Sequence, residues 1–555
     1  MTMRNQGKSS TIDPILLEVF KHQFSSIAEE MGAILRKSSF SPNIKERRDF
    51  SCAIFNADGR MIAQAAHIPV HLGSMPLSVA SAILKYQQTE SPLVPGDTII
   101  LNDPYLGGTH LPDITLVTPV FVADPPKLNH PGQTNNLLAS HKRPYAYVAS
   151  RAHHSDVGGI VPGSMPIARE IFQEGLIIPP IKLISGGKLS NDIMDFILAN
   201  VRTPEERLGD LHAQIGANQR GVRLLINLIN RYSLSEVSHY MEELLYYTER
   251  MTRNLISNLP NGCFSFEDYL DNNGISDSLI PIKVTITISN DTATVDFTGS
   301  SAQQEGSVNA VFAITLSAVN YVFRSLIDMD IPNNSGCLAP IKIIAPLGSI
   351  VNSVHPAPVA GGNVETSQRI VDVLLGALAQ ACPGKIPAAS QGTMNNVSIG
   401  GWDPEHKRYY TYYETIGGGT GASLEDDGVS AIHSHMTNTL NTPIEALEYN
   451  FPIRINRYEI RKNSGGKGAH HGGDGIIREI KFLTDVQVTL ITDRRFTSPY
   501  GLSGGESGQK GENILVHGIQ ESLLPGKGSF LISQGDILRI SSPGGGGYGE
   551  AVERE

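Results

Sequence analysis

The chain has 555 residues, 40% of them hydrophobic and 18% charged, a composition typical of a large folded protein and not of a disordered one. Its net charge of -11, without any block of Lys and Arg, argues against a nucleic-acid partner. The four cysteines form no CxxC pair, and we find neither a signal peptide nor an apolar run of about 18 residues that could span a membrane. We therefore expect a cytoplasmic protein that contacts neither nucleic acid nor membrane.

A long helix is predicted at the N-terminal end. Asp13 followed by Pro14 is typical of a helix start, and apolar residues then mark one face to about Lys37. Residues 52–64 alternate in polarity around an Ala-Asp-Gly turn, which predicts a hairpin, and a second helix is expected over residues 77–86.

Two histidines four residues apart, His67 and His71, lie between this hairpin and the second helix. Pro69 stands between them and favours an extended or turn segment over a helix. We weigh these histidines evenly as proton-transfer or substrate-pocket groups and as hydrogen-bonded structural residues.

The region of residues 102–180 is rich in Gly, Pro, His and Asp, which is typical of loops that carry a site on a scaffold. After it, TPEE at residues 203–206 resembles a capping box and predicts long helices to about residue 256. Residues 282–299 alternate on both sides of an Asn-Asp pair and predict another hairpin. Helices are expected over residues 311–328 and 366–381.

Beyond Pro383 the chain becomes glycine-rich, with short apolar runs between the glycine clusters. We predict an α+β fold: a large, mixed, multi-sheet architecture with long bracing helices and a glycine-rich β region at the C-terminal end. The expected divisions are residues 13–260, with a candidate metal site, residues 261–385, with the hairpin and helices, and residues 386–555. The glycine cluster at residues 416–422 could also hold an anion, although turns are the commoner use of such clusters.

Two loop motifs carry the residues that favour metal chemistry. GGTHLPD contains His110 and Asp113, and SRAHHSDVGG contains His153, His154 and Asp156. Two imidazoles and one carboxylate suit Zn, Mn, Fe or Ni and leave coordination positions open for water or substrate. The alternative is a pair of loops in which histidine and aspartate merely hydrogen-bond to each other.

The motifs together resemble the hydantoinase B family, which includes the B subunits of ATP-dependent N-methylhydantoinases and 5-oxoprolinases and related subunits of acetone carboxylases. The resemblance is carried by ERRDFSCAIF, AHIPVHLGSMP, LNDPYLGGTHLPD, SRAHHSDVGGIVPGSMP, GGNVETSQRI, QGTMNN and GGGTGA. It implies a divalent metal held by His110, Asp113 and His153. An extra stretch between the two motifs leaves the choice between His153 and His154 open.

The resemblance also implies the function. A hydantoinase A-type partner subunit would use ATP to phosphorylate a small cyclic amide, and this chain, within a hetero-oligomer, would complete the hydrolysis. We expect His154, Asp156, His67 and His71 to orient ligands or move protons. The substrate would be bound by Glu46, Arg48 and Asp49 of ERRDFS and by Arg369, which follows a helix start that could hold an anion.

Two other functions stay open at this point. The chain could belong to an ATP-dependent ketone carboxylase of acetone carboxylase type, or it could be a noncatalytic scaffold for its ATPase partner. The sequence does not name the ring substrate or the metal.

Overall fold

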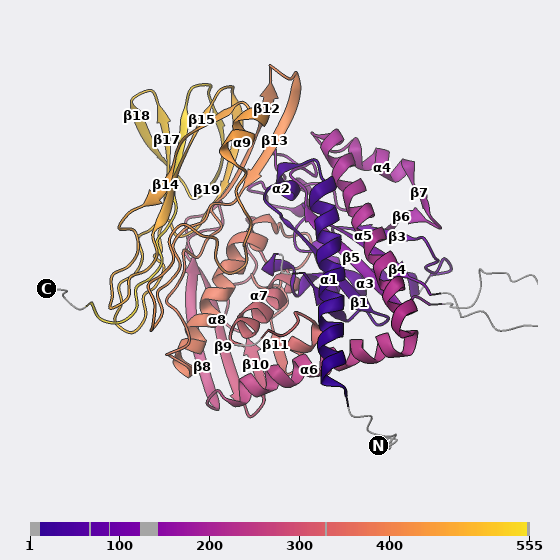
Figure 1. Ribbon diagram of the computed structural model, residues 1–555. Helices are drawn as coiled ribbons and strands as arrows, with labels where there is room; N and C mark the ends of the chain where they lie inside the picture. Colours follow the sequence, from indigo (N-terminus) through magenta and orange to yellow (C-terminus); the bar gives the residue numbers. More distant parts are fainter. Residues whose placement is uncertain (1–11, 66–67, 88, 123–142, 328–329, 552–555) are drawn as a thin grey trace, which may run out of the picture.

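The structure, a computed structural model, describes residues 12–65, 68–87, 89–122, 143–327 and 330–551. In this part of the chain no helix is both long enough and apolar enough to cross a membrane. The predicted α+β class is confirmed: an N-terminal sheet with long helices, a second sheet below it and two C-terminal sheets make up the molecule (Figure 1).

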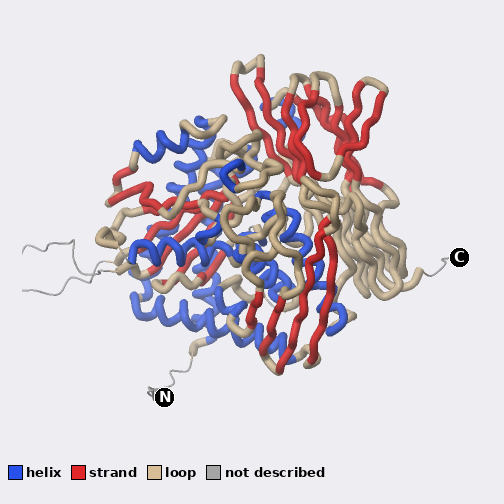
Figure 2. The backbone as a smooth tube through the Cα atoms, turned by 180° about the vertical axis from the view of Figure 1, so that it is seen from behind, coloured by secondary structure: helices blue, strands red, loops and turns tan. Residues whose placement is uncertain are grey.

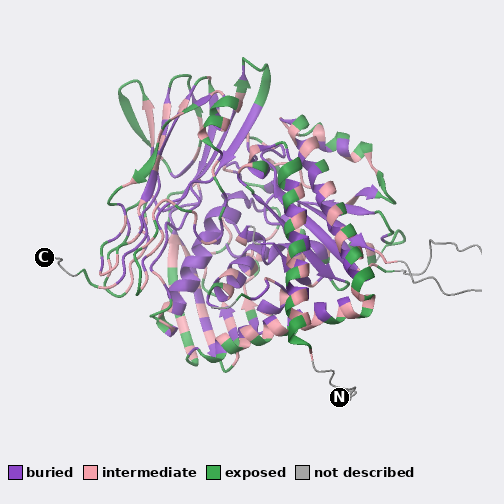
Figure 3. Cartoon of the chain, in the orientation of Figure 1, coloured by how far each residue is buried: buried purple, intermediate pink, exposed green. Residues whose placement is uncertain are grey.

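The N-terminal sheet has seven strands in the order β2-β1-β5-β4-β3-β6-β7. Its strands are β1 (Phe50–Asn56), β2 (Met61–Gln64), β3 (Thr98–Leu101), β4 (Asp113–Val120), β5 (Ala146–His153), β6 (Ile181–Ser185) and β7 (Lys188–Leu189). Every residue of β1, β4 and β5 is buried, because helices cover both faces of the sheet (Figure 3). The hairpin predicted over residues 52–64 is confirmed as β1 and β2.

Long helices pack against this sheet. They are α1 (Pro14–Ser38), α5 (Pro204–Tyr232) and α6 (Leu234–Ser257) on one face and α3 (Ser74–Gln87) on the other, with the short α2 (Pro42–Lys45) and α4 (Asn191–Leu198) beside them. The Asp13 carboxylate accepts a hydrogen bond from the Ile15 amide at 2.9 Å, so the predicted start of α1 is confirmed. The side chain of Thr203 makes no such bond at the start of α5, and the capping-box expectation was wrong.

The second sheet has the order β11-β10-β9-β8; α8 packs on β8 and β9, α7 packs against α8, and α6 contacts β10. Its elements are β8 (Gly262–Leu270), β9 (Ile280–Ser289), β10 (Thr292–Asp296), β11 (Ile341–Ile344), α7 (Phe312–Ser325) and α8 (Ser367–Ala381). Buried and less buried residues alternate along β9, because only one face of the sheet packs on α8. The predicted hairpin and both predicted helices are confirmed.

The C-terminal sheets pack face to face around a core that includes Ile399, Phe482 and Leu538. The first contains β13 (Arg408–Glu414), β12 (Asn396–Asp403), β16 (Val486–Ile491) and β19 (Lys527–Ile532) in that order. The second contains β14 (Ile453–Arg461), β15 (Gly475–Phe482), β20 (Ile537–Ser541), β17 (Glu512–His517) and β18 (Gln520–Leu524), and α9 (Ile444–Asn450) lies against β14.

Glycine-rich segments form a bundle of extended chains beside these sheets, drawn as loops that run side by side in Figure 2. Backbone hydrogen bonds join them: the Gly466 amide donates to the Gly545 carbonyl and the Gly545 amide to the Gly473 carbonyl, both at 2.9 Å. A Cβ on Gly545 would lie 1.9 Å from the Thr420 carbonyl oxygen. The chains therefore pack more closely than any residue with a side chain allows.

Candidate metal site

Strand pairing brings the two predicted metal-binding motifs together. β4 begins at Asp113 and β5 ends at His153, and these two residues lie opposite each other in the antiparallel ladder. His110 lies in the turn that precedes β4, and its carbonyl accepts a hydrogen bond from the Asp113 amide at 3.1 Å. The sheet register thus places three side chains from two loops around one point.

The three side chains converge closely. His110 Nε2 lies 3.1 Å from Asp113 Oδ1 and 3.1 Å from His153 Nδ1, and the last two atoms are 3.3 Å apart. All three residues are buried, and their potential ligand atoms lie within 4.8 Å of one another. Such an arrangement of two imidazoles and a carboxylate can hold a divalent metal ion.

The second oxygen of Asp113 is held by other side chains. Asp113 Oδ2 accepts a hydrogen bond from the Thr109 hydroxyl and lies 3.3 Å from His71 Nε2, while His71 Nδ1 lies 2.9 Å from the Ser51 hydroxyl. His71 belongs to the 3-10 turn η1 (Pro69–His71), in keeping with the expectation that Pro69 prevents a helix here. His67 lies outside the described residues.

Two residues that the sequence motifs did not single out also contact the cluster. The amide nitrogen of Asn363 lies 3.2 Å from His110 Nε2, and the ring of Tyr413 stacks on His153 with centroids 4.5 Å apart and an angle of 16°. Asn363 comes from the π-helical turn η5 (Gly362–Thr366), which lies in the motif that had been assigned to anion binding. No local pattern distinguishes Tyr413 among the tyrosines of β13.

A small cavity of ≈ 20 Å³ adjoins the cluster. Its lining combines polar residues with an apolar wall: Asp49, Ile68, Val70, His71, Asp113, His153, Asn363, Val364, Met394, Tyr413, Thr415, Met436, Thr437 and Thr439. The polar groups face the same space as the candidate ligands, so a molecule bound at the cluster would also meet these threonines and methionines.

Burial sets the protonation of the cluster. Burial disfavours the Asp113 carboxylate, but the neighbouring histidines, His110 first, outweigh this cost and hold its pKa well below the ordinary value. Burial lowers the pKa of His71 and of His153, although Asp113 opposes the shift. Burial raises the pKa of Asp49 despite the opposing charges of His153 and Arg47. Burial thus favours an uncharged His153 beside an ionised Asp113, and deprotonated side chains are the ones that bind a cation.

Of the ERRDFS residues, Asp49 lines the cavity, whereas Glu46 is half-buried and Arg48 is exposed with a φ of 58°. The guanidinium that points inward is that of Arg47, which is fully buried and stacks over Tyr413 at 5.0 Å. The structure therefore brings Asp49 to the cluster, does not bring Arg48 there, and places Arg47 where Arg48 had been expected.

The structure does not bring His154 and Asp156 into the cluster. His154 Nε2 contacts the Gln214 side chain of α5 at 3.0 Å, and burial beside Arg207 lowers the pKa of His154 to about 4. Asp156 binds the guanidinium and the amide of Arg202 at 2.9 and 2.6 Å. Both residues tie the loop after β5 to the helical layer.

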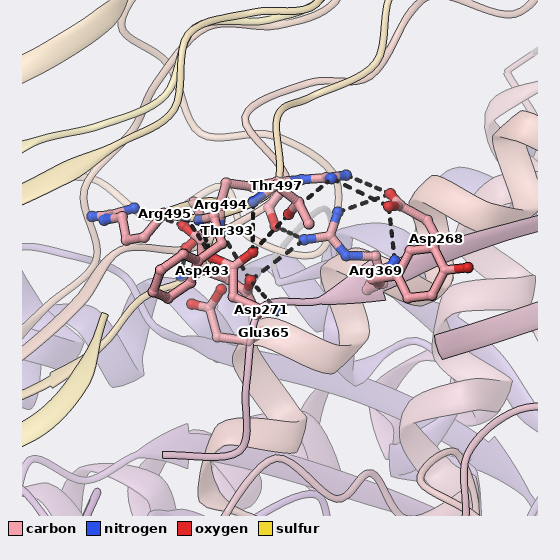
Figure 4. Close-up of polar contacts among 12 residues, drawn as sticks. Asp268, Asp271, Glu365, Arg369, Thr393, Asp493, Arg494, Arg495 and Thr497 are labelled. Atoms are coloured by element: carbon pink, nitrogen blue, oxygen red, sulfur yellow. Dashed lines mark hydrogen bonds and ion pairs between the residues drawn. The ribbon is translucent and has the colours of Figure 1, made fainter. Parts of the chain in front are cut away.

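Arg369 lies in a different place from the one predicted, a buried network of ion pairs between α8 and the C-terminal region (Figure 4). It binds Asp372 at 2.7 Å and Asp268 at 3.1 Å, and Arg494 binds the same two carboxylates. Glu365, also drawn in Figure 4, accepts a hydrogen bond from the Asn396 side chain at 2.8 Å. The network joins segments far apart in the sequence and leaves Arg369 engaged in ion pairs.

The glycine cluster of residues 416–422 makes no anion cradle. The amides of Gly418, Gly419, Thr420 and Ala422 donate to carbonyl groups of neighbouring segments at 2.9–3.1 Å. An anion would have to break these bonds, so the structural use of the glycines explains the motif.

The fold and the site define a large α+β protein with a buried group of two histidines and an aspartate suited to a divalent metal. The chain belongs to the hydantoinase B/oxoprolinase family, whose model matches residues 13–551. It is 41% identical over 568 residues to 5-oxoprolinase 1 of Arabidopsis thaliana, covering 97% of this chain and 42% of the relative. It is 32% identical to the candidate B-type component of a D-/L-hydantoinase of Pseudomonas sp. strain NS671, covering 98% and 91%.

Solved structures have the same fold. The ATP-dependent caprolactamase of Pseudomonas jessenii superposes with a TM-score of 0.86 at 27% identity, covering 98% of this chain and 92% of the other. Acetone carboxylase superposes with a TM-score of 0.88 at 18% identity, covering 98% and 76%, and this likeness concerns the fold alone. The chain spans only about 42% of the length of the plant 5-oxoprolinase.

Proposed function

We propose that this chain is the B-type component of an ATP-dependent cyclic amidohydrolase of the 5-oxoprolinase or N-methylhydantoinase kind. The observation that carries the proposal is the convergence of His110, Asp113 and His153 on one buried point next to a cavity. The 41% identity to a 5-oxoprolinase and the fold shared with an ATP-dependent caprolactamase support this class of reaction.

The cluster fits a divalent metal such as Zn, Mn or Fe. The donor set is of the right chemistry, and the neighbouring Asn363 amide and Tyr413 ring hold the imidazoles in fixed positions. When bound, the ion supplies Lewis-acid chemistry, which polarises an oxygen atom and makes water a better nucleophile near neutral pH.

The other residues of the site have definable tasks. Thr109 and His71 hold the second oxygen of Asp113 and so fix the direction of the first. His71 lines the cavity; its Nε2 donates to the Asp113 carboxylate, so its Nδ1 accepts from the Ser51 hydroxyl, and these two hydrogen bonds fix the imidazole beside the site. Asp49 lines the cavity in which the substrate would bind, and its side chain is buried.

A partner subunit is part of the proposal. An amide is a poor electrophile because resonance stabilises its carbonyl group, and phosphorylation of the amide oxygen removes that resonance. The remaining length of the plant relative leaves room for a second functional region, and the Pseudomonas relative is named as one component of a hydantoinase with several. We place ATP use on a hydantoinase A-type partner and the hydrolytic step on this chain.

Reconstitution tests the proposal. The chain combined with an A-type partner and ATP is expected to release ADP and a ring-opened product from 5-oxoproline, N-methylhydantoin or a related ring. His110→Ala should reduce product formation about 100-fold, since it removes one of three ligands. A variant complex with unchanged turnover would instead support a scaffold role, and a requirement for bicarbonate would support carboxylation.

A further inference from the structure

Arg47 is a buried cation with neutral partners. Its side chain is 0% exposed, and its guanidinium donates to the Asn43 side chain, to the Tyr413 carbonyl at 3.0 Å and to the hydroxyls of Thr415 and Thr439 at 2.8 and 3.2 Å. Among the described residues no carboxylate lies within ion-pair distance of it. A buried charge without a counter-ion raises the free energy of the folded state, so we expect the charge of Arg47 to serve a function there.

Most of the other fully buried arginines have an ion-pair partner. In the part of the chain that the structure describes, six arginine side chains are fully buried, and four of them form ion pairs: Arg207, Arg369, Arg478 and Arg494. The remaining two, Arg47 and Arg151, have only neutral hydrogen-bond acceptors in the described structure. Both lie beside the candidate metal site, and the charge of each acts on the carboxylates there.

Two threonine hydroxyls connect the guanidinium of Arg47 to the cavity by hydrogen bonds. Thr415 and Thr439 both accept from its Nη2 nitrogen, their hydroxyl oxygens are 2.9 Å apart, and both residues line the cavity with Asp113 and His153. Because the two hydroxyls also share a hydrogen bond, one of their protons stays between the two oxygens and the other is left to donate into the cavity. Thr437 lines the same wall.

The formal charges around the cavity favour an anion once a cation is bound. By formal charge Asp113 contributes one negative charge and Arg47 and Arg151 two positive charges, while burial favours the neutral form of Asp49. A divalent ion at the cluster, which belongs to the proposed function, would add two more positive charges to a buried site.

We propose that the Thr415 and Thr439 hydroxyls, supported by Arg47, form a subsite for an oxyanion of the substrate. The group would be either a carboxylate attached to the ring amide or the phosphoryl group of the activated ring. Both offer oxygen atoms that accept from hydroxyl donors and balance the metal charge. The subsite would favour a lactam that bears a carboxylate, as 5-oxoproline does, over an uncharged ring.

The size of the cavity agrees with a subsite for one end of a ligand. A volume of ≈ 20 Å³ accommodates about one water-sized group and not a whole ring. Met394 and Met436 form part of the remaining wall, and methionine is the apolar side chain that changes shape most readily. The ring would occupy space that these two side chains vacate.

Calorimetric titration of the full chain loaded with Mn²⁺ tests the proposal with three small molecules. 5-Oxoproline and 2-pyrrolidinone share a ring but only the first has a carboxylate, and inorganic phosphate represents the phosphoryl group. For Thr415→Val combined with Thr439→Val, we expect affinity for 5-oxoproline or for phosphate to fall about tenfold. Affinity for 2-pyrrolidinone should stay unchanged.

Thr442→Val is the matched control, because Thr442 is a buried threonine of the same segment whose hydroxyl makes no hydrogen bond with Arg47. Thr439→Ser keeps the hydroxyl and should keep the affinity, which separates a lost donor from a disturbed fold. A loss confined to 5-oxoproline identifies a carboxylate, and a loss confined to phosphate identifies a phosphoryl group.

The subsite is contradicted if the double variant binds all three molecules as the wild type does, if Thr442→Val causes an equal loss, or if the metal-loaded wild type binds neither anion. The ring-opening assay reports on the proposed function separately. A complex that hydrolyses charged and neutral rings equally well would uphold that function while overturning the subsite.

Discussion

His153 and His154 are neighbours of the same chemistry with opposite surroundings, and the difference arises from the alternation of side chains along a strand. His153 faces Asp113 across the ladder, whereas His154 faces Gln214 of α5. The spacing of the motifs predicted a cluster of imidazoles and a carboxylate at this point. It could not choose between adjacent histidines, because the register of β5 against β4 depends on residues far away in the sequence.

Arg47 and Arg48 illustrate the same limit. The motif predicted a charged contribution to the site, but the direction of each side chain depends on the turn that follows α2, where Arg48 has a positive φ. Contacts of Arg47 with Thr415 and Thr439 join residues 368 and 392 positions apart. No pattern of neighbouring residues in the sequence predicts contacts over such separations.

Glu174 allows a prediction about pH and stability. It is fully buried, accepts hydrogen bonds from the Val359 and Ala360 amides at 2.8 and 2.9 Å, and burial raises its pKa to about 8, although these amides oppose the shift. The folded state therefore keeps a proton that the unfolded state releases above about pH 4.5. The stability contributed by the neutral group is complete below that pH and is lost as pH rises towards 8.

The side chain introduced by Glu174→Gln is neutral at every pH, so the substitution should remove this loss of stability at high pH. We expect its melting temperature to exceed that of the wild type near pH 8, where the wild-type carboxyl ionises, and the difference to shrink on acidification, as measured by differential scanning calorimetry. Melting curves that shift in parallel at all pH values would contradict the assignment of a protonated Glu174.

At the scale of elements, β13 shows how a strand supports the site. Tyr413 stacks on His153 and donates its hydroxyl to Asn396 at 2.7 Å, and Asn396 in turn donates to the buried Glu365. Its neighbour Tyr412 donates to Glu414 at 2.8 Å on the other face of the strand. The two tyrosines are equally buried.

Tyr413→Phe and Tyr412→Phe therefore make a matched pair. Each variant loses one buried hydrogen bond, and we expect a loss of about 1 kcal/mol in unfolding free energy for Tyr413→Phe, whose acceptor is an amide, and of about 2 kcal/mol for Tyr412→Phe, whose acceptor is a carboxylate. Only Tyr413→Phe frees the ring that holds His153, so only this variant should weaken metal binding, about tenfold in dissociation constant. Equal metal affinities in the two variants would show that Tyr413 has no positioning role.

The hairpins and most helices could be predicted because their signals are local: alternation, turn residues and, for α1, a capping aspartate. The failed cap at Thr203 did not shift the predicted helix, since Pro204 and the apolar face of α5 still mark its start. The network around Arg369 could not be predicted, because it depends on β8, α8 and the segment after β16 meeting in space.

At the scale of the whole molecule, the α+β class and the glycine-rich C-terminal region follow from composition and periodicity, but the glycine bundle does not. Glycine clusters are usually turns, and nothing in a single segment shows that several will pack against one another. Whether residues 13–260, 261–385 and 386–555 act as separate domains stays a prediction.

The bundle makes Gly545→Ala a severe substitution. A Cβ there would meet the Thr420 carbonyl at 1.9 Å, so the backbones must separate, and we expect a loss of about 3 kcal/mol in denaturant unfolding. Gly384→Ala, whose Cβ would meet only a Leu424 methyl group at 3.4 Å, should cost less than about 1 kcal/mol. Equal costs would rule out close packing of the bundle.

The most direct test of the proposed centre is the metal content of purified wild-type, His153→Gln and His154→Gln proteins, measured by inductively coupled plasma mass spectrometry. We predict one divalent ion per chain in the wild type and in His154→Gln, and a loss of most of it in His153→Gln. A wild type without stoichiometric metal, or a His153→Gln protein that retains it while His154→Gln does not, would contradict the proposed centre.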